Sequence, residues 1–186
     1  MSNKSKIKKP AQPLKLDFGA GRNPQPGFSS VDLYAPDADI KLDLFKFPFP
    51  WKDNTVDEIV ASHFVEHIPQ DKRWPFFAEC WRILKPDAVM RIVVPSWKSE
   101  RAYGDMTHAW PPVTTMALFY LNKAWRENNK LTYGAYDIKC NFDHQSGPTG
   151  VSPEFAQKAH EVQIFACQHY LEAYPDAWCT LTKRPL

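Results

Sequence analysis

The stretch LKLDFGAGRNPQPGFSSVD, residues 14–32, constrains the fold more than any other part of the chain. Its first residues form a short apolar run that ends at Phe18 and is typical of a buried strand. A turn of small residues follows at once: Gly19, Ala20 and Gly21. A second strand is predicted over residues 28–33, with Asp32 near its end. Two such strands, side by side and parallel, form a nucleoside pocket, because glycines let the backbone approach the ligand and a carboxylate binds ribose hydroxyls.

The glycine pattern differs from that of a dinucleotide site. A dinucleotide fingerprint reads G-x-G-x-x-G, opens a helix and places its acid about 20 residues further on. Here the third glycine is missing, and the prolines within residues 23–27 disfavour a helix before the second strand. Because a pyrophosphate would then lack a helix N-terminus to bind, we predict a nucleoside ligand without phosphates.

Strands continue to alternate with helices and loops along the chain, which predicts a parallel sheet covered by helices. The next predicted elements are a short third strand, a fourth strand, a helix with Pro75 in its first turn, and a fifth strand, over residues 39–44, 55–61, 72–84 and 88–94. Ser62 and His63 follow the fourth strand, at the edge where open α/β sheets bind ligands. Aromatic residues between Phe45 and Trp51 are open to two interpretations, as core or as one wall of the pocket.

The sequence beyond Pro95 is aromatic and irregular, and its elements are predicted from local signals. They are a helix started by Pro111 or Pro112 and running through Tyr120, a sixth strand over residues 136–142, a long helix capped by Ser152 and running through Ala166, and a last strand over residues 177–182.

A series of motifs between residues 14 and 96 resembles the class I S-adenosylmethionine-dependent methyltransferases. The motifs are LDFGAG (16–21), VDLY (31–34), DLFKFPFP (43–50), VDEIVASHFVEHI (56–68) and WRILKPDAVMRIVVPS (81–96). The resemblance weakens after residue 96 and is closest to members with a clipped first helix. It implies a Rossmann-like open sheet, mostly parallel, with helices on both faces and an antiparallel last strand. The usual glycine pair after the helix is Asp87-Ala88 here, and Asp tolerates a left-handed turn.

The same resemblance implies methyl transfer from S-adenosylmethionine and a set of residues that bind it. The glycine loop, which consists of Gly19, Ala20 and Gly21 and is supported by Asp17, would let the backbone approach the methionine end of S-adenosylmethionine. Asp32 would hold the ribose, and Asp43 would hold the adenine amino group. The full implied set is Asp17, Gly19, Ala20, Gly21, Asp32, Leu33, Asp43, Leu44, Ser62 and His63. An insertion over residues 95–132 would build the acceptor pocket.

Histidines are the candidate bases, because imidazole titrates near neutral pH. We name His63, His108 and Asp105 as candidate catalytic residues. His67, with Glu66 before it, is a further candidate base, although a structural role that joins helix and sheet is the favoured interpretation. The Asp105/His108 pair is open to three roles: an orientated base, a metal pair or a loop hydrogen bond. Because two ligands do not make a metal site and no third has telling spacing, no metal site is predicted.

A small-molecule acceptor is the first expectation. Amino-group DNA methyltransferases resemble one another in a D/N-P-P-aromatic tetrad after the fourth strand, where this chain reads SHFVEH. Two alternatives stay open. One is a cofactor-binding, non-catalytic partner subunit, in view of the missing first helix and the lack of a clear base; the other is a nucleic-acid methyltransferase, supported only by the lysine-rich start. The oligomeric state is left open.

Composition fits one globular domain in 186 residues, with 44% hydrophobic residues and four cysteines that form no C-x-x-C pair. We expect free thiols rather than disulfides. The net charge of +2 hides a basic start followed by a slightly acidic remainder. We therefore predict a disordered basic leader over residues 1–12 and a single domain over residues 13–186, in a cytoplasmic protein without a secretory signal or membrane span.

Overall fold

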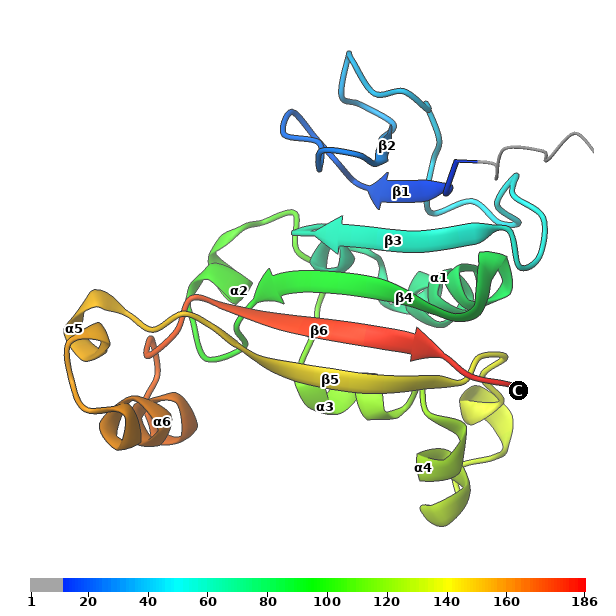
Figure 1. Cartoon of the computed structure of the whole chain (residues 1–186). Coiled ribbons are helices and arrows are strands. Elements are labelled where there is room, and N and C mark those ends of the chain that lie inside the picture. Colours follow the sequence, from blue (N-terminus) through cyan, green and yellow to red (C-terminus); the bar gives the residue numbers. More distant parts are fainter. Residues whose placement is uncertain (1–11) are drawn as a thin grey trace, which may run out of the picture.

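The computed structural model describes residues 12–186, in which six strands form one sheet in the order β2-β1-β3-β4-β6-β5 (Figure 1). The strands are β1 (Lys15–Phe18), β2 (Ser29–Val31), β3 (Val56–Ser62), β4 (Leu84–Pro95), β5 (Phe142–Thr149) and β6 (Asp176–Lys183). The first four pair in parallel, and β6 runs antiparallel to both β4 and β5. The predicted open, mostly parallel sheet with an antiparallel last strand is confirmed. Nearly all of the predicted leader lies outside the described residues.

The helices are short apart from one. They are α1 (Gln70–Ile83), α2 (Arg101–Gly104), α3 (Thr115–Phe119), α4 (Lys123–Asn128), α5 (Pro153–Ala156) and α6 (His160–His169), with single 3-10 turns η1 (Val65–His67) and η2 (Gly134–Tyr136). No helix separates β1 from β2, as the prolines between them predicted. Among the described residues, none of the helices has both the length and the apolar character needed to cross a membrane.

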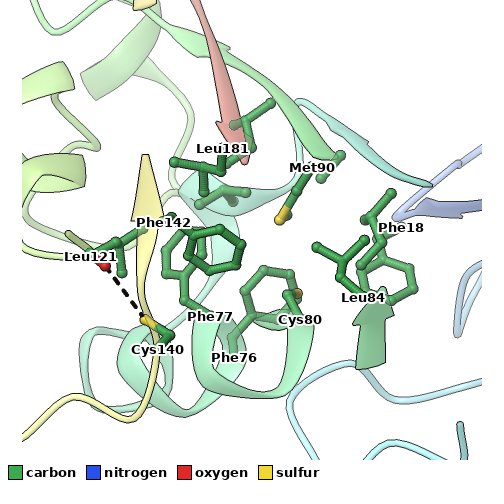
Figure 2. Close-up of a cluster of buried hydrophobic side chains, with 14 of the residues drawn as sticks. Phe18, Phe76, Phe77, Cys80, Leu84, Met90, Leu121, Cys140, Phe142 and Leu181 are labelled. Atoms are coloured by element: carbon green, nitrogen blue, oxygen red, sulfur yellow. Dashed lines mark hydrogen bonds between the residues drawn. The ribbon is translucent and has the colours of Figure 1, made fainter. Parts of the chain in front are cut away.

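One face of the sheet carries the core. Strand register aligns Leu16, Ile59, Met90 and Leu181 across β1, β3, β4 and β6. Helix α1 packs on this face through Phe76, Phe77 and Cys80, and Leu121 and Phe142 join the same cluster from the chain beyond α3 and from β5 (Figure 2). The opposite face is more polar: buried Glu58 pairs there with Lys15 at 2.9 Å and with Arg91. The packed face therefore fixes the strands whose carboxyl ends meet at one edge.

All four cysteines are free thiols, as expected. Cys80, Cys140 and Cys179 are buried. Burial raises the pKa of the Cys140 and Cys179 thiols to about 12, so they are packing residues.

The predicted third strand over residues 39–44 is wrong, because only an isolated parallel bridge between Val31 and Ile40 forms there. The Asp39 carboxylate accepts the N–H of Ser30 at 2.8 Å, so a side chain takes a donor that strand pairing would use. Asp43 likewise accepts the N–H of Phe45 at 3.0 Å and turns the chain. This segment is a loop whose side chains bond to the backbone.

Helix α1 and the strand after it differ from prediction at their boundaries. The helix begins at Gln70, so Pro75 lies in its second turn and not in the first. Proline there removes one intrahelical hydrogen bond, while the neighbouring Phe76 and Phe77 are buried and hold the helix to the sheet. Strand β4 follows without a loop, and Asp87 adopts the left-handed conformation expected of it, with φ of 61°.

Two predictions on the chain after β4 are wrong. The helix predicted from Pro111 or Pro112 begins only at Thr115, because the Thr114 hydroxyl accepts the N–H of Ala117 at 3.1 Å and caps it. The predicted sixth strand over residues 136–142 is mostly a loop, and the strand begins at Phe142. The backbone of this loop is held by the buried Arg126, which donates to the carbonyl oxygens of Ile138 and Cys140 at 3.2 and 3.0 Å.

The long helix predicted from Ser152 to Ala166 is also wrong, because it breaks into α5 and α6. Ala159 is extended between them, with ψ of 150°. The Gln163 side chain donates to the carbonyl oxygens of Ala156 and Lys158 at 3.3 and 2.8 Å, which supplies partners for the end of α5. The predicted last strand over residues 177–182 is confirmed as β6.

Candidate active site

A cavity of about 540 Å³ opens where β1 and β3 end. It is lined by Gly19, Asp32, Leu33, Tyr34, Leu42, Asp43, Leu44, Phe45, His63, Phe64, His67 and Thr107. This cavity is called the first cavity below. Its size falls in the range of roughly 300–1,000 Å³ typical of small-molecule sites.

The glycine loop is held tightly beside this cavity. Gly19 has φ of +68° and donates its N–H to the carbonyl of Val31 at 2.8 Å. A Cβ at Gly19 would lie 2.3 Å from the Phe64 ring, so the close approach requires glycine. Buried Asp17 accepts the N–H of Gln25 at 2.7 Å and so ties the end of β1 to the chain that follows the glycines. Burial raises the pKa of Asp17, so keeping this carboxyl ionised in the loop costs free energy.

Asp32 is fixed by the backbone around it. Its carboxylate accepts N–H groups from Gly21 at 3.0 Å, Tyr34 at 2.7 Å and Ala35 at 2.8 Å. Burial raises the pKa of Asp32, but these three donors, aided by Lys41, outweigh it and leave the pKa below its usual value. Asp32 therefore stays ionised at the cavity wall, and its remaining lone pairs suit hydroxyl donors such as those of a ribose.

A second cavity, of about 790 Å³, adjoins the first and shares His63 and His67 with it. Its lining residues are His63, Glu66, His67, Pro95, Glu100, Arg101, Gly104, Asp105 and His108. Charged side chains of both signs surround it. The arrangement places an apolar cavity and a polar cavity on two sides of the same pair of histidines.

His63 is held at this junction by the end of β3. It adopts φ of 53° and donates its N–H to the carbonyl of Val93 at 2.8 Å. Its Nδ1 lies 3.4 Å from Oε1 of Glu66, and its Nε2 lies 3.8 Å from Oδ2 of Asp176. Glu66 raises the pKa of His63, an effect that burial opposes and Asp176 supports.

The loop after α2 brings His108 against His67. The two rings meet edge to face, with centroids 4.8 Å apart. Asp105 Oδ2 lies 3.7 Å from Nε2 of His108, and Thr107 Oγ1 lies 3.1 Å from Nδ1 of His67. Arg73 of α1 holds the loop by donating to the carbonyl oxygens of residues 109 and 111 at 2.9 and 2.7 Å.

The residues predicted to bind the cofactor divide into two groups. Those that line the first cavity are Gly19, Asp32, Leu33, Asp43, Leu44 and His63, and those that do not are Asp17, Ala20, Gly21 and Ser62. Asp17 accepts the N–H of Gln25, Gly21 donates its N–H to Asp32, and Ser62 is exposed at the end of β3. The catalytic candidates His63, Asp105 and His108 come together around the second cavity.

Several lining residues lay outside the predicted set. Tyr34, Phe45 and Phe64 each follow closely after a predicted residue on the same loop, so the sequence motifs could have predicted them. Thr107 and Arg101 come from the irregular segment after Pro95, where no strand pattern marks their position.

Comparison with known proteins shows which proteins the chain resembles. Residues 26–92 match the family model described as a methyltransferase domain. No curated protein matches the chain. An S-adenosylmethionine-dependent methyltransferase from Archaeoglobus fulgidus is 20% identical, with a TM-score of 0.66 over 92% of this chain and 86% of that one.

Two further solved structures share the fold at lower identity. The YcgJ protein from Bacillus subtilis is 13% identical, with a TM-score of 0.54 over 95% of this chain and 94% of that one. An S-adenosylmethionine-dependent methyltransferase from Thermotoga maritima is 11% identical, with a TM-score of 0.52 over 94% of this chain and 84% of that one. The chain therefore has the fold of S-adenosylmethionine-dependent methyltransferases, and residues 26–92 are similar in sequence to a methyltransferase domain.

Proposed function

We propose that the protein transfers the methyl group of S-adenosylmethionine to a small polar acceptor bound in the second cavity. The observation that carries this proposal is the contact between the two cavities, which share His63 and His67. A ligand in each cavity would meet its neighbour at these side chains. Such an arrangement supplies the alignment that a bimolecular transfer needs.

The first cavity suits the cofactor. S-adenosylmethionine supplies an activated sulfonium methyl group when bound, so the protein has to align the acceptor and exclude water. Ionised Asp32 would accept the ribose hydroxyls in charge-assisted hydrogen bonds, and Asp43 lies on the same wall for the adenine amino group. Gly19 presents backbone without a side chain beside the cavity.

The second cavity suits a small acceptor with polar groups. Glu100, Arg101 and Asp105 give its wall charges of both signs, so it favours a ligand that carries donors and acceptors over an apolar one. His63 lines both cavities and is the side chain placed to contact the acceptor beside the cofactor.

The first experiment is calorimetric titration of the full chain with S-adenosylmethionine, S-adenosylhomocysteine and, as a control, NAD. We expect the first two to bind at a single site and NAD not to bind. Absence of binding by either adenosyl ligand would overturn the proposal. Preferential binding of NAD would overturn the cofactor class.

A second experiment separates an enzyme from a binding subunit. Labelled S-adenosylmethionine is offered with pools of small polar acceptors, and Arg101→Ala is compared with Lys130→Ala, which lies on the exposed loop after α4. We expect label transfer that falls in the first variant and not in the second. Cofactor binding without transfer to any pool would instead support the non-catalytic subunit.

A further inference from the structure

We propose that Glu66, His67 and His108 bind one divalent transition-metal ion at the wall that the two cavities share. One ligand atom from each side chain lies within 4.8 Å of the other two. Metal–ligand bonds of about 2.0–2.2 Å put two bound ligand atoms at most about 4.4 Å apart, so small side-chain rotations close the site. The sequence spacing concealed this set, because His108 reaches the other two only through the loop after α2.

Glu66 is the observation that points to a missing cation. Its residue is only 4% exposed, and neither carboxylate oxygen has a hydrogen-bond partner among the described residues. A buried carboxylate without partners is costly, so such groups are normally paired or coordinate a metal. The Glu66 side chain also lines the second cavity. A cation bound there would give both oxygens a partner.

The neighbouring cations do not fill this role. The Arg73 guanidinium, which acts on Glu66 only through space, donates instead to backbone carbonyl oxygens, including that of Ile68 at 3.2 Å and that of Pro111 at 2.7 Å. His63 Nδ1 is 3.4 Å from Glu66 Oε1, which is longer than the usual N–H···O bond of about 2.7–3.2 Å. Oε2 of Glu66 accepts no hydrogen bond within residues 12–186.

The histidines are orientated by bonds on their other nitrogens, as metal-binding histidines are. Nδ1 of His108 lies 3.3 Å from the carbonyl oxygen of Ala102, which can only accept, and the tautomer that points its N–H at this oxygen leaves the lone pair on Nε2. The Thr107 hydroxyl lies 2.7 Å from a carboxylate oxygen of Asp105 and 3.1 Å from Nδ1 of His67. When the hydroxyl donates to Asp105 it accepts from His67, which leaves Nε2 of His67 as the free ligand.

Two imidazoles and one carboxylate are the ligands of Zn²⁺, Mn²⁺ and Fe²⁺ rather than of Mg²⁺ or Ca²⁺. Three protein ligands leave coordination positions open, and the ligands lie on the wall of the second cavity. Resting on the proposed function, we infer that an open position takes an oxygen of the acceptor. The acceptor class is therefore one that carries a hydroxyl or carboxylate group.

The test is titration of the chelator-treated full chain, free of any histidine tag, with Zn²⁺ and Mn²⁺. We expect one ion per chain with Kd below about 10 μM for the tighter ion. Glu66→Gln and His108→Ala should each weaken binding at least about 10–100-fold, since even outer-shell changes have effects of that size. His160→Ala, an exposed histidine on α6, is the matched control and should bind as the parent does.

Thermal unfolding checks that the variants are folded and gives a second readout. At free metal about 100 times the parent's Kd, the parent and His160→Ala should gain about 5–10 °C in Tm, and Glu66→Gln should gain at most about half as much. Binding weaker than about 1 mM in the parent would overturn the proposal. Equal affinity in the parent and the ligand variants would overturn it as well, because the ion would then lie elsewhere.

Cofactor titration separates this inference from the proposed function. If S-adenosylmethionine binds while neither metal does, the metal site fails and the methyltransferase proposal stands. If the metal binds through Glu66 and His108 while S-adenosylmethionine does not, the site stands and the acceptor role fails with the proposed function.

Discussion

The two cavities differ in how the chain builds them. The first is made mostly by the segments that follow β1, β2 and β3, so pairing of the strands brings Gly19, Asp32 and His63 together. The second depends on the segment after β4, which reaches the site through side-chain bonds such as those of Arg73 to backbone carbonyls. Strand register thus places residues of the first cavity, whereas individual polar contacts place those of the second.

Truncating the buried Phe76 ring, which packs against the segments that support the first cavity, should have the largest effect. The Phe76 ring lies within about 6 Å, between centroids, of Phe18, Phe49 and Phe64, each from a different segment of the first cavity's support. Phe76→Ala should lower the free energy of unfolding by about 3–5 kcal/mol. Phe165→Ala, at a residue 51% exposed on α6, should change it by less than about 0.5 kcal/mol.

Urea unfolding at equilibrium measures both variants. Equal losses would mean that the segment around α6 is part of the same core, and the contrast between strand-built and loop-built regions would not hold.

The glycine loop offers a matched pair at the first cavity. Gly19→Ala combines a left-handed conformation with a Cβ 2.3 Å from Phe64 and should cost about 2–4 kcal/mol. Gly21→Ala shares the positive φ but meets nothing within 4 Å, so it should cost only about 1 kcal/mol. Urea unfolding of the two variants measures the difference, and an equal cost would show that Phe64 moves aside freely.

The same difference decides how much could be predicted from sequence. Strands β1, β3, β4 and β6 were predicted within a few residues, because hydrophobic patterning and turn residues set each of them locally. Gly19 and Asp32 of the first cavity directly follow β1 and β2, whereas Asp43 was named from the motif resemblance and no strand precedes it. Pairing of the strands then brings Gly19 and Asp32 together, and no further signal in the sequence is needed.

Elements that depend on distant side chains could not be predicted in this way. Residues 136–142 alternate like a strand, yet Arg126 takes two of their carbonyl groups. The break between α5 and α6 depends on Gln163, and the proximity of His108 to Glu66 depends on a loop held by Arg73. Such contacts leave no periodic trace, which is why the sequence did not group Glu66 and His67 with His108.

Asp32 tests the first cavity in isolation. Asp32→Ala removes the charged acceptor for the ribose and should weaken S-adenosylmethionine at least tenfold, or about 1.4 kcal/mol. Arg101→Ala, which alters only the second cavity, should leave cofactor affinity unchanged. Calorimetry on both variants, with circular dichroism as a folding control, measures this. Unchanged affinity in Asp32→Ala would show that the second motif has been misinterpreted.

The smallest expected effect concerns residues 47–53, which follow Phe45 of the first cavity along the chain and are held to α1 by hydrogen bonds. The Glu79 carboxylate accepts the N–H of Phe49 at 2.7 Å and pairs with Arg82 at 2.7 Å. The hydrogen bond from Arg82 holds the pKa of Glu79 below its usual value, with burial opposing it. A carboxyl whose pKa is lower in the folded state stabilises the fold above its unfolded pKa, and this stability is lost as pH falls through the folded pKa.

Glu79→Gln should therefore lower the free energy of unfolding by about 1 kcal/mol at neutral pH. The deficit should shrink towards zero as pH falls below the usual glutamate pKa of 4.5, because the parent carboxyl then becomes neutral too. Urea unfolding across this range measures it, with Glu100→Gln, on the exposed loop of the second cavity, as a control that should show no such trend. A deficit that stays constant at low pH would mean that the loss of stability comes from the different geometry of the amide and not from the missing charge. In that case the anchoring of residues 47–53 to α1 would rest on packing of the aromatic rings, and the electrostatic link between α1 and the first cavity would be lost from the comparison.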